Sequence, residues 1–324
     1  LQTRAMRGCL RWAVNSRMWT PKGGAAGAEF KCLLSLIPEK NEREAVTKFV
    51  FFEDQKRALL SRLLCRRACC DVLGLPSFKA LEIRRTRGQK PFLLQPRPQQ
   101  EDLANWNFNV SHEGDWVVLA SEPLCICGVD VAAPARTDPS KASIDVKRDF
   151  GDYLTSKEWE AVEKAAAGDV AAAVEGPPGY AAFQRYWSSK EALVKARGDG
   201  LGFDLHRASF DFDEPRSDDC QLSGLAIASV LVDGTLARHW RFFQHQLDDG
   251  HCVTVARGPT FDVVDQKGEF AKTLTRPTAQ FSAAAWDEEL ARVSPNFEVL
   301  AVGQLIPEDA IEAFLRVGGE IPCE

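Results

Sequence analysis

Residues 187–203 combine a carboxylate, two ammonium groups and a glycine-rich turn in the run W-S-S-K-E-A-L-V-K-A-R-G-D-G-L-G-F. Glu191 and Lys195 are four positions apart, so on a helix they share one face, one turn after Trp187. Such a pair can bind a cation through its carboxylate and stabilise a negative charge through its ammonium group. The same spacing fits an exposed ion pair worth about 0.3–0.5 kcal/mol, and spacing alone favours that blander interpretation.

A second carboxylate, Asp130, lies in the apolar run C-G-V-D-V at residues 127–131. A single buried carboxylate near the end of a strand is more often a structural hydrogen-bond acceptor than a ligand. If Asp130 faces Glu191, however, two carboxylates and the oxygens of a diphosphate would form an all-oxygen site that suits Mg2+. The magnesium hypothesis therefore needs both residues.

These groups need elements to hold them. Residues 180–197 predict a helix, because few Gly or β-branched residues interrupt them and Gly198 supplies a left-handed cap. Residues 106–120 predict a hairpin that turns at Glu113-Gly114-Asp115. Antiparallel strands are expected at residues 208–212, 226–232, 239–243 and 252–256. We therefore expect an α+β fold of two similar halves, each a small, largely antiparallel sheet packed by helices.

The remaining segments are predicted from the same kinds of signal. Residues 10–14 should form a first strand, 38–74 should be mostly helical with Arg62 and Arg66 on a solvated face, and 155–167 should form a helix opened by a capping box. Residues 165–179 indicate an insertion or loose hairpin. In the tail, residues 260–280 should be extended, with short helices at 283–293 and 308–317.

Charge is distributed unevenly along the chain. The net charge is -6, but residues 1–100 hold 20 Lys and Arg against 8 Asp and Glu, a balance of +12, and the rest carries -18. The first third is thus suited to an anion, which could be nucleic acid, a membrane surface or a multiply phosphorylated small molecule. No nucleic-acid motif and no run of eighteen apolar residues is visible, so we expect neither nucleic acid nor a membrane as partner.

The basic turn at residues 85–90 is the most concentrated part of that charge. It presents three cations and a flexible glycine in six residues, and guanidinium and ammonium groups make charge-assisted bonds to phosphate. A surface hairpin would look similar, and sequence alone leaves the two interpretations even. Ser111 and His112, just before the predicted hairpin turn, could likewise simply satisfy local backbone groups.

The ten cysteines follow no metal-ligand spacing and are interpreted as reduced, buried thiols. That favours a reducing compartment. The basic first residues could be the remnant of a targeting segment, but the first strand begins so early that little room remains for one. We expect the cytoplasm, with the mitochondrion or plastid as alternatives.

Four short runs, taken in order, resemble a known family. The run F-N-V-S-H at residues 108–112, then C-G-V-D-V, W-S-S-K-E-A-L-V-K-A and G-D-G-L-G-F, resemble the sequence blocks of the 4'-phosphopantetheinyl transferases, in their broad-range, monomeric branch. The likeness runs from about Arg11 to Arg257. It implies two pseudo-twofold halves, residues 1–123 and 124–258, with the active site between them. Residues 259–324 lie beyond it as an extension whose role is open.

The resemblance also implies a reaction and a set of residues. The protein would be a monomeric, Mg2+-dependent holo-acyl-carrier-protein synthase, which moves the phosphopantetheine arm of coenzyme A onto a serine of an acyl or peptidyl carrier domain. Asp130 and Glu191 would hold Mg2+, Glu191 would take the serine proton directly or through water, and Lys195 would stabilise the phosphoryl charge. Lys190 would assist or face solvent. The residues implied to contact coenzyme A are Arg43, Arg85, Thr86, Arg87, Gly88, Gln89, Lys90, Asn109, Val110, Ser111, His112, Asp130, Glu191 and Lys195.

Within that list Ser111 and His112 are implied to touch phosphate, His112 at the 3'-phosphate. One departure from many bacterial members is Ala132, where they carry a further acid. Carrier domains are usually acidic, so the basic first third could dock the carrier as well as coenzyme A. Two alternatives stay open: a metal-independent acyl-CoA-dependent transferase, and a non-enzymatic module that binds carrier domains.

Overall fold

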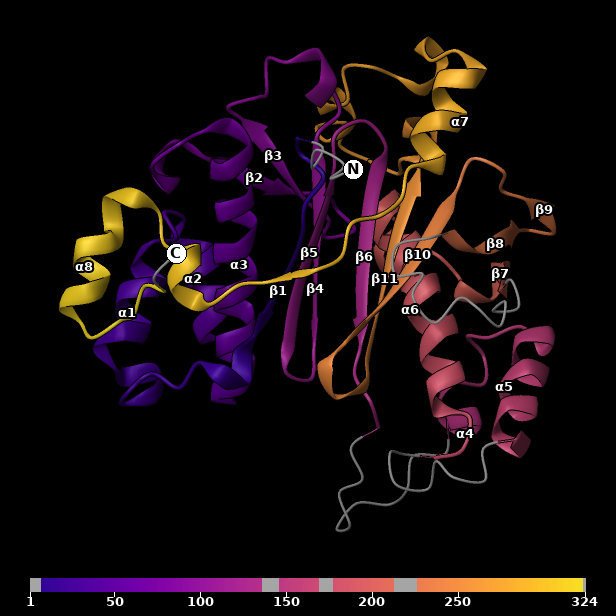
Figure 1. Cartoon of the computed structure of the whole chain (residues 1–324), viewed down its shortest axis with the longest axis horizontal. Helices are drawn as coiled ribbons and strands as arrows, with labels where there is room; N and C mark the ends of the chain where they lie inside the picture. The colour runs from indigo at the N-terminus through magenta and orange to yellow at the C-terminus, as the bar shows by residue number, and fades with distance from the viewer. Residues whose placement is uncertain (1–6, 136–145, 169–176, 213–225, 323–324) are drawn as a thin grey trace, which may run out of the picture.

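The computed structural model describes residues 7–135, 146–168, 177–212 and 226–322. Two sheets dominate it, one in each half of the chain, and the last residues return from the second half across to the first (Figure 1). This confirms the expected α+β fold, with small antiparallel sheets packed by helices. Among the described residues, no helix is both long enough and apolar enough to cross a membrane.

The first sheet has the strand order β12-β1-β5-β4. Its neighbours are antiparallel except that β12 pairs parallel with β1. The helix α3 (Phe52–Leu73) packs against β4 and β5 and buries leucines and cysteines in the first core, and its left-handed cap is Gly74. The bounds are β1 (Arg11–Asn15), β4 (Asn107–Glu113), β5 (Trp116–Glu122) and β12 (Glu298–Val299).

Two short helices, α1 (Ala28–Ser35) and α2 (Lys40–Thr47), complete this half, with a separate hairpin of β2 (Glu82–Arg85) and β3 (Pro91–Gln95). The expected solvated face of α3 is wrong. The side chains of Arg62 and Arg66 are only 12% and 3% exposed, because α2 and the residue before it supply Glu42 and Glu39 as partners.

The second sheet has the order β6-β11-β10-β8-β7, with β9 paired to β8. The helices α5 and α6 pack on it, and α6 lies directly against β6 and β11. The strand bounds are β6 (Ile126–Ala132), β7 (Ala208–Phe212), β8 (Ala226–Val232), β9 (Thr235–Leu236), β10 (Arg241–Leu247) and β11 (His251–Gly258). The helix bounds are α4 (Val146–Phe150), α5 (Ser156–Gly168) and α6 (Tyr180–Arg197).

An apolar layer joins the two sheets. It contains Trp116 and Val118 from β5, Val129 and Val131 from β6, and Val255 from β11, all buried.

The strands and helices expected in the second half are present, with α6 at the predicted bounds. The predicted insertion at residues 165–179 lies largely outside the described residues.

The C-terminal tail belongs structurally to the first half. After α7 (Ala283–Ala291) it forms β12 beside β1, and it ends with α8 (Ile311–Arg316) near α1 (Figure 1). Leu300, Leu305 and Phe314 are buried in the first core. The two helices were expected, but the extended run at 260–280 is instead broken by 3-10 turns such as Ala271–Thr273.

The eight described cysteines are free thiols, six of them buried, as expected. Burial raises the pKa of Cys65 to about 11, which makes it an unreactive apolar neighbour.

Candidate active site

The packing of α6 on β6 creates the site. An added Cβ on Gly128 would lie 2.1 Å from the carbonyl oxygen of Ala192, so only glycine lets the helix come this close to the strand. Because side chains alternate along a strand, Asp130 points to the same face two residues later. The glycine and the aspartate of the run C-G-V-D-V thus act together: one admits the helix and the other meets it.

Asp130 forms the centre of a buried polar cluster. Its Oδ1 lies 2.5 Å from the Lys195 ammonium group and accepts a hydrogen bond from the Ser111 hydroxyl at 3.0 Å. Lys195 also donates to Ser111 at 2.8 Å. The other oxygen, Oδ2, is buried and finds no hydrogen-bond partner among the described residues. An unpartnered carboxylate oxygen is costly to bury and marks a position where a cation would be favourable.

Glu191 lies on α6 one turn before Lys195 and is half-buried. Burial raises its pKa, Lys195 opposes that rise, and the charge of Asp130 adds to it. The two carboxylates are thus close enough to influence each other. Within the described ranges, no three His, Cys, Asp or Glu side chains gather into a metal-ligand group. Two oxygen donors with one free, buried oxygen nevertheless fit a hard cation such as Mg2+ better than a soft one.

The sequence interpretation missed Glu113 at the end of β4. Its Oε2 accepts a hydrogen bond from the Ala133 amide at 3.3 Å. Although the Glu113 side chain is exposed, reduced hydration next to the cluster and then the charge of Asp130 raise the pKa of Glu113 to about 7. The position of Glu113 directly after Ser111 and His112 could have indicated a site residue, but an acid in a predicted hairpin turn indicates only a turn.

Strand β4 contacts β6 through side chains. The Oδ1 atoms of Asn107 and Asn109 accept hydrogen bonds from the amides of Cys127 and Val129, at 2.9 and 3.0 Å. The next two steps are Ser111 with the Val131 amide, at 3.4 Å, and Glu113 with that of Ala133. All four pairs are twenty residues apart, so they form a regular side-chain ladder between the two sheets. Asn109, implied to touch coenzyme A, has its amide oxygen engaged here.

His112, beside Ser111 on β4, is influenced by cations of both α6 and α3. Although its side chain remains accessible to solvent, reduced hydration and the charges of Lys195, Arg57 and Arg62 lower the pKa of His112 to about 4. Arg57 was not anticipated at the site. It donates to the carbonyl oxygen of Gly114 at 2.8 Å and so ties α3 to the hairpin turn next to His112 and Glu113.

Arg85 is held by the same group of helices. Its Nε lies 3.3 Å from Glu42, whose other oxygen is 2.6 Å from Nε of Arg62. Arg43, on the same helix as Glu42, donates to the carbonyl oxygens of Ile37 and Pro38 at 2.6 and 2.8 Å. Arg85 is therefore linked through Glu42 to Arg62 of α3, whereas Arg43 is engaged with its own loop.

The rest of the basic turn packs on the end of α6. An added Cβ on Gly88 would fall 2.0 Å from the Gly198 carbonyl oxygen, so the two glycine-containing turns meet backbone to backbone. Arg87 donates to Gln266 at 2.5 Å, and Gln89 adopts a positive φ of 68°. The turn therefore joins the first half to the glycine-rich segment that ends α6.

Lys90, predicted to contact coenzyme A from the basic turn, is buried. Its ammonium group donates to the carbonyl oxygen of Cys127 at 2.5 Å and lies 5.5 Å from the ring centre of Phe270. Burial lowers the pKa of Lys90 to about 8. Thr86 is also buried and closes the turn by accepting from the Lys90 amide at 3.2 Å.

Lys190 has neither of the expected roles. Its side chain is fully buried, 2.8 Å from Glu158 of α5, and it donates to the carbonyl oxygens of Leu205 and Ala208. It therefore joins α6 to α5 and β7 on the side of the helix away from Asp130. Lys190 and Lys195 are five residues apart on α6, so they project about 140° apart around the helix axis. This difference separates a structural lysine from a site lysine.

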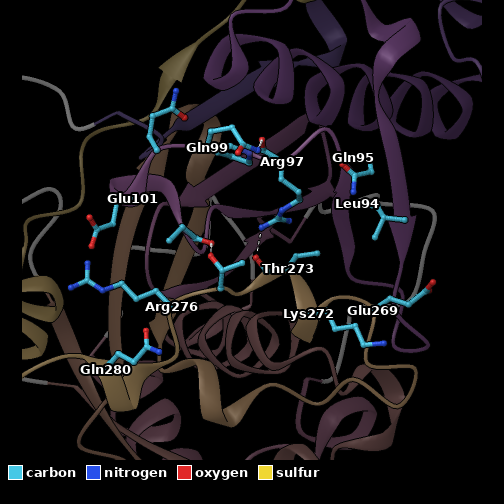
Figure 2. Close-up of a pocket in the computed structure, with 14 residues that line it drawn as sticks. Leu94, Gln95, Arg97, Gln99, Glu101, Glu269, Lys272, Thr273, Arg276 and Gln280 are labelled. Atoms are coloured by element: carbon cyan, nitrogen blue, oxygen red, sulfur yellow. Dashed lines mark hydrogen bonds between the residues drawn. The ribbon is translucent and has the colours of Figure 1, made fainter.

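A pocket of about 760 Å³ lies elsewhere, between the proline- and glutamine-rich loop after β3 and the tail (Figure 2). Arg97 crosses it and donates to the carbonyl oxygens of Leu93, at 2.9 Å, and Thr273. Its described lining contains Glu101, Glu269, Lys272, Arg276 and Gln280, and none of the candidate site residues. The presence of a pocket therefore does not identify the site.

The fold therefore has two sheets packed by helices, with Asp130, Glu191 and Lys195 where α6 packs on β6. Comparison with known families identifies the class of protein. Residues 17–124 match the family model "4'-phosphopantetheinyl transferase, N-terminal", and residues 126–256 match "4'-phosphopantetheinyl transferase superfamily". The chain belongs to the 4'-phosphopantetheinyl transferase superfamily.

Individual relatives agree. A phosphopantetheinyl transferase of Thraustochytrium sp. is 35% identical over 245 residues, which cover 76% of this chain and 77% of the relative. The L-aminoadipate-semialdehyde dehydrogenase-phosphopantetheinyl transferase of Mus musculus is 34% identical over 257 residues, 76% of this chain and 74% of the relative. The Homo sapiens protein of the same name is 32% identical over 253 residues, with the same coverage.

Proposed function

We propose that this protein transfers the 4'-phosphopantetheine arm of coenzyme A to a serine of an acyl or peptidyl carrier domain, in a reaction that needs Mg2+. Family membership supports the reaction type, coenzyme A as substrate and carrier domains as acceptors. The observation that best supports the metal is the buried Oδ2 of Asp130, which has no partner among the described residues. It lies on the strand against which the helix of Glu191 packs, and the charge of Asp130 influences Glu191.

In the proposed reaction the serine oxygen forms a bond to the β-phosphorus of coenzyme A. The diphosphate bond breaks, adenosine 3',5'-bisphosphate leaves, and Glu191 receives the serine proton directly or through water. Asp130 and Glu191 would hold Mg2+, which would neutralise charge on the diphosphate. Because little covalent chemistry falls to the protein, its residues act by positioning and by stabilising charge.

Three of the chain's own groups fit these tasks. The raised pKa of Glu191 suits a general base, because a less acidic carboxylic acid holds a proton better. Lys195 is placed to stabilise negative charge beside Asp130. We place the 3'-phosphate near the cations Arg57 and Arg85, with Arg43 and Arg87 as further candidates. His112, whose pKa is lowered to about 4, would contact it as a neutral ring.

The test is a mass measurement on an apo carrier protein incubated with coenzyme A. We expect Asp130→Ala and Glu191→Gln to lower kcat/KM by several orders of magnitude, whereas Lys157→Met, an exposed lysine on α5, should not. A metal-independent acyl-CoA transferase would keep its activity in both site variants and would add an acyl group instead. A binding module without catalysis would retain the carrier and leave its mass unchanged.

We also propose that the protein works as a monomer, without nucleic acid or membrane, in the cytoplasm or alternatively a mitochondrion or plastid. Support comes from the motif set and the free thiols. Light scattering at working concentration and localisation of the tagged full-length protein would test these points; a stable dimer or a membrane-bound fraction would contradict them.

A further inference from the structure

The pocket in Figure 2 lies at the far end of β4 from the candidate active site. One wall is the loop between β3 and β4, and the other is the tail segment from Glu269 to Gln280. Ala104 of the lining comes three residues before β4, which reaches the active site at its other end, Glu113, so a strand length of about 20 Å separates the two. The volume of about 760 Å³ lies within the range of small-molecule sites. A ligand here would occupy a second, separate site.

Charge in this lining is predominantly positive. The cations are Arg97, Lys272 and Arg276, and the acids are Glu101 and Glu269. Glu269 is paired with Arg84, which lies outside the lining. Among the described residues, none of the three cations has a carboxylate oxygen within ion-pair distance. Three cations are therefore opposed by one exposed, unpaired acid, Glu101.

Two of these cations are fixed in place by hydrogen bonds. The fully buried Asn105 accepts from the Arg276 amide at 2.8 Å and donates to the Arg276 carbonyl oxygen at 2.6 Å. The Arg97 guanidinium group donates to the carbonyl oxygens of Leu93, at 2.9 Å, and Thr273, so it bridges the loop and the tail. Groups that are already ordered lose little entropy when a ligand binds.

We propose that this pocket binds a small, multiply charged organic anion, phosphorylated or polycarboxylate, at a site separate from that of coenzyme A. Guanidinium and ammonium groups make charge-assisted bonds to phosphate and carboxylate oxygens alike. Four glutamines in the lining supply neutral donors and acceptors for the rest of the molecule. Because the pocket is concave and Arg97 is half-buried in it, a small molecule fits better than the broad surface of a protein.

The test is a calorimetric titration of the full chain with pyrophosphate and, separately, with citrate. Coenzyme A is kept at saturation to occupy the candidate active site, and a chelator removes metals that would bind the probes. We expect one anion to bind per chain. In the double variant Lys272→Gln/Arg276→Gln the affinity should fall by about 10- to 100-fold, because two charged hydrogen-bond donors are lost. Tighter binding of pyrophosphate would indicate a phosphorylated ligand, and tighter binding of citrate a polycarboxylate.

Lys267→Gln is the matched control. Lys267 is an exposed lysine of the same tail segment but lies outside the lining, so its replacement should leave the affinity for both probes unchanged. If the double variant fails to fold, Lys272→Gln alone gives the same test, since Lys272 is exposed, and it should show part of the loss. A bound anion would join the loop to the tail, so each probe that binds should raise the melting temperature of the unmodified protein and not that of the double variant.

Three results would overturn the inference. Neither probe could bind while coenzyme A is saturating, or the double variant could bind both as tightly as the unmodified protein. An acidic carrier domain could instead lose affinity in the double variant although neither probe binds, and the surface would then be a protein interface. Failure of the proposed function would look different, because it would leave the effect of the double variant on anion binding intact.

Discussion

Lys190 and Lys195 lie five residues apart on the same helix, and they have different roles because their surroundings differ. Lys195 meets Asp130 and Ser111, whereas Lys190 is fully buried against Glu158. Glu158 also accepts hydrogen bonds from the amides of Thr155 and Phe210, at 2.7 and 2.8 Å. Both oxygens of the carboxylate are therefore engaged, and the pair fixes α6 against α5 and β7.

Replacing Lys190 should lower the stability of the fold without lowering catalytic activity. Lys190→Met leaves Glu158 buried without its counter-charge, and breaking such a pair typically costs about 3–5 kcal/mol. We expect the urea midpoint to fall while the folded fraction keeps its specific activity. In the control Lys157→Met, whose exposed pair with Asp211 is worth at most about 1 kcal/mol, the midpoint should barely move. A stable but inactive Lys190→Met would show that Lys190 takes part in catalysis.

His245 should make the protein sensitive to acid. It is buried on β10 against Phe297, and burial, followed by the charge of Arg11, lowers its pKa to about 3. The unfolded chain, with an ordinary value of 6.5, binds more protons between those limits, so the stability that His245 contributes is lost as pH falls through that window. His245→Phe should flatten the melting temperature between pH 6.5 and 4. An unchanged pH profile would contradict this.

For individual residues, the sequence predicted which charged side chains matter better than it predicted the groups with which they pair. Glu191, Lys195 and Asp130 were found because spacing and motif order place them. Arg62 was placed on the wrong face, and the burial of Lys90 and Lys190 was not predicted, because burial of a charge depends on an acceptor from a distant segment, such as Glu42 or the Cys127 carbonyl oxygen. No local pattern reports such a partner.

Among the secondary-structure elements, α6 and β6 control the geometry of the site most, through their contact with each other. The helix bounds were predictable, since Gly198 takes a φ of 89° that few other residues adopt. The side-chain ladder of β4 was not, although the alternation of Asn107, Asn109 and Ser111 was visible. A polar alternation indicates a solvated face unless one knows that the neighbouring strand offers its amides there.

Gly128→Ala tests this contact. The added methyl group would overlap the Ala192 carbonyl oxygen, so helix and strand must move apart, typically at about 1–3 kcal/mol. Because Asp130 and Lys195 lie on the two elements, we expect kcat/KM to fall further than the melting temperature alone would explain. Gly168→Ala at the end of α5, where an added Cβ has no atom within 4 Å, is the control and should change neither. Normal activity in Gly128→Ala would show that the separation does not matter.

Across the whole molecule, the tail connects the halves. Arg11 of β1 and Arg257 of β11 share the buried carboxylate of Glu122, and the tail covers this triad: Ser294 accepts from Arg11 at 2.9 Å, and Arg257 donates to the Arg292 carbonyl oxygen at 2.7 Å. The sequence left the tail's role open because it has no motif. Its apolar residues complete a core whose other members lie between Trp12 and Leu119, in the first part of the chain.

Removing a tail side chain should therefore destabilise the first half. Phe314→Ala deletes a side chain only 1% exposed in that core, which typically costs about 3–5 kcal/mol. The neighbouring Leu315→Ala, at 50% exposure, is the control and should stay within about 0.5 kcal/mol. Chemical denaturation monitored by tryptophan fluorescence would measure both. Equal, small effects would mean that the tail only rests on the surface.

The most direct test of the central claim is the mass of an apo carrier protein after incubation with coenzyme A and the full chain, with Mg2+ or with a chelator. The account predicts a covalent gain of about 340 Da, the size of a phosphopantetheine group, that requires the metal and disappears in Asp130→Ala. Transfer that continues in the chelator, or that survives loss of Asp130, would contradict it.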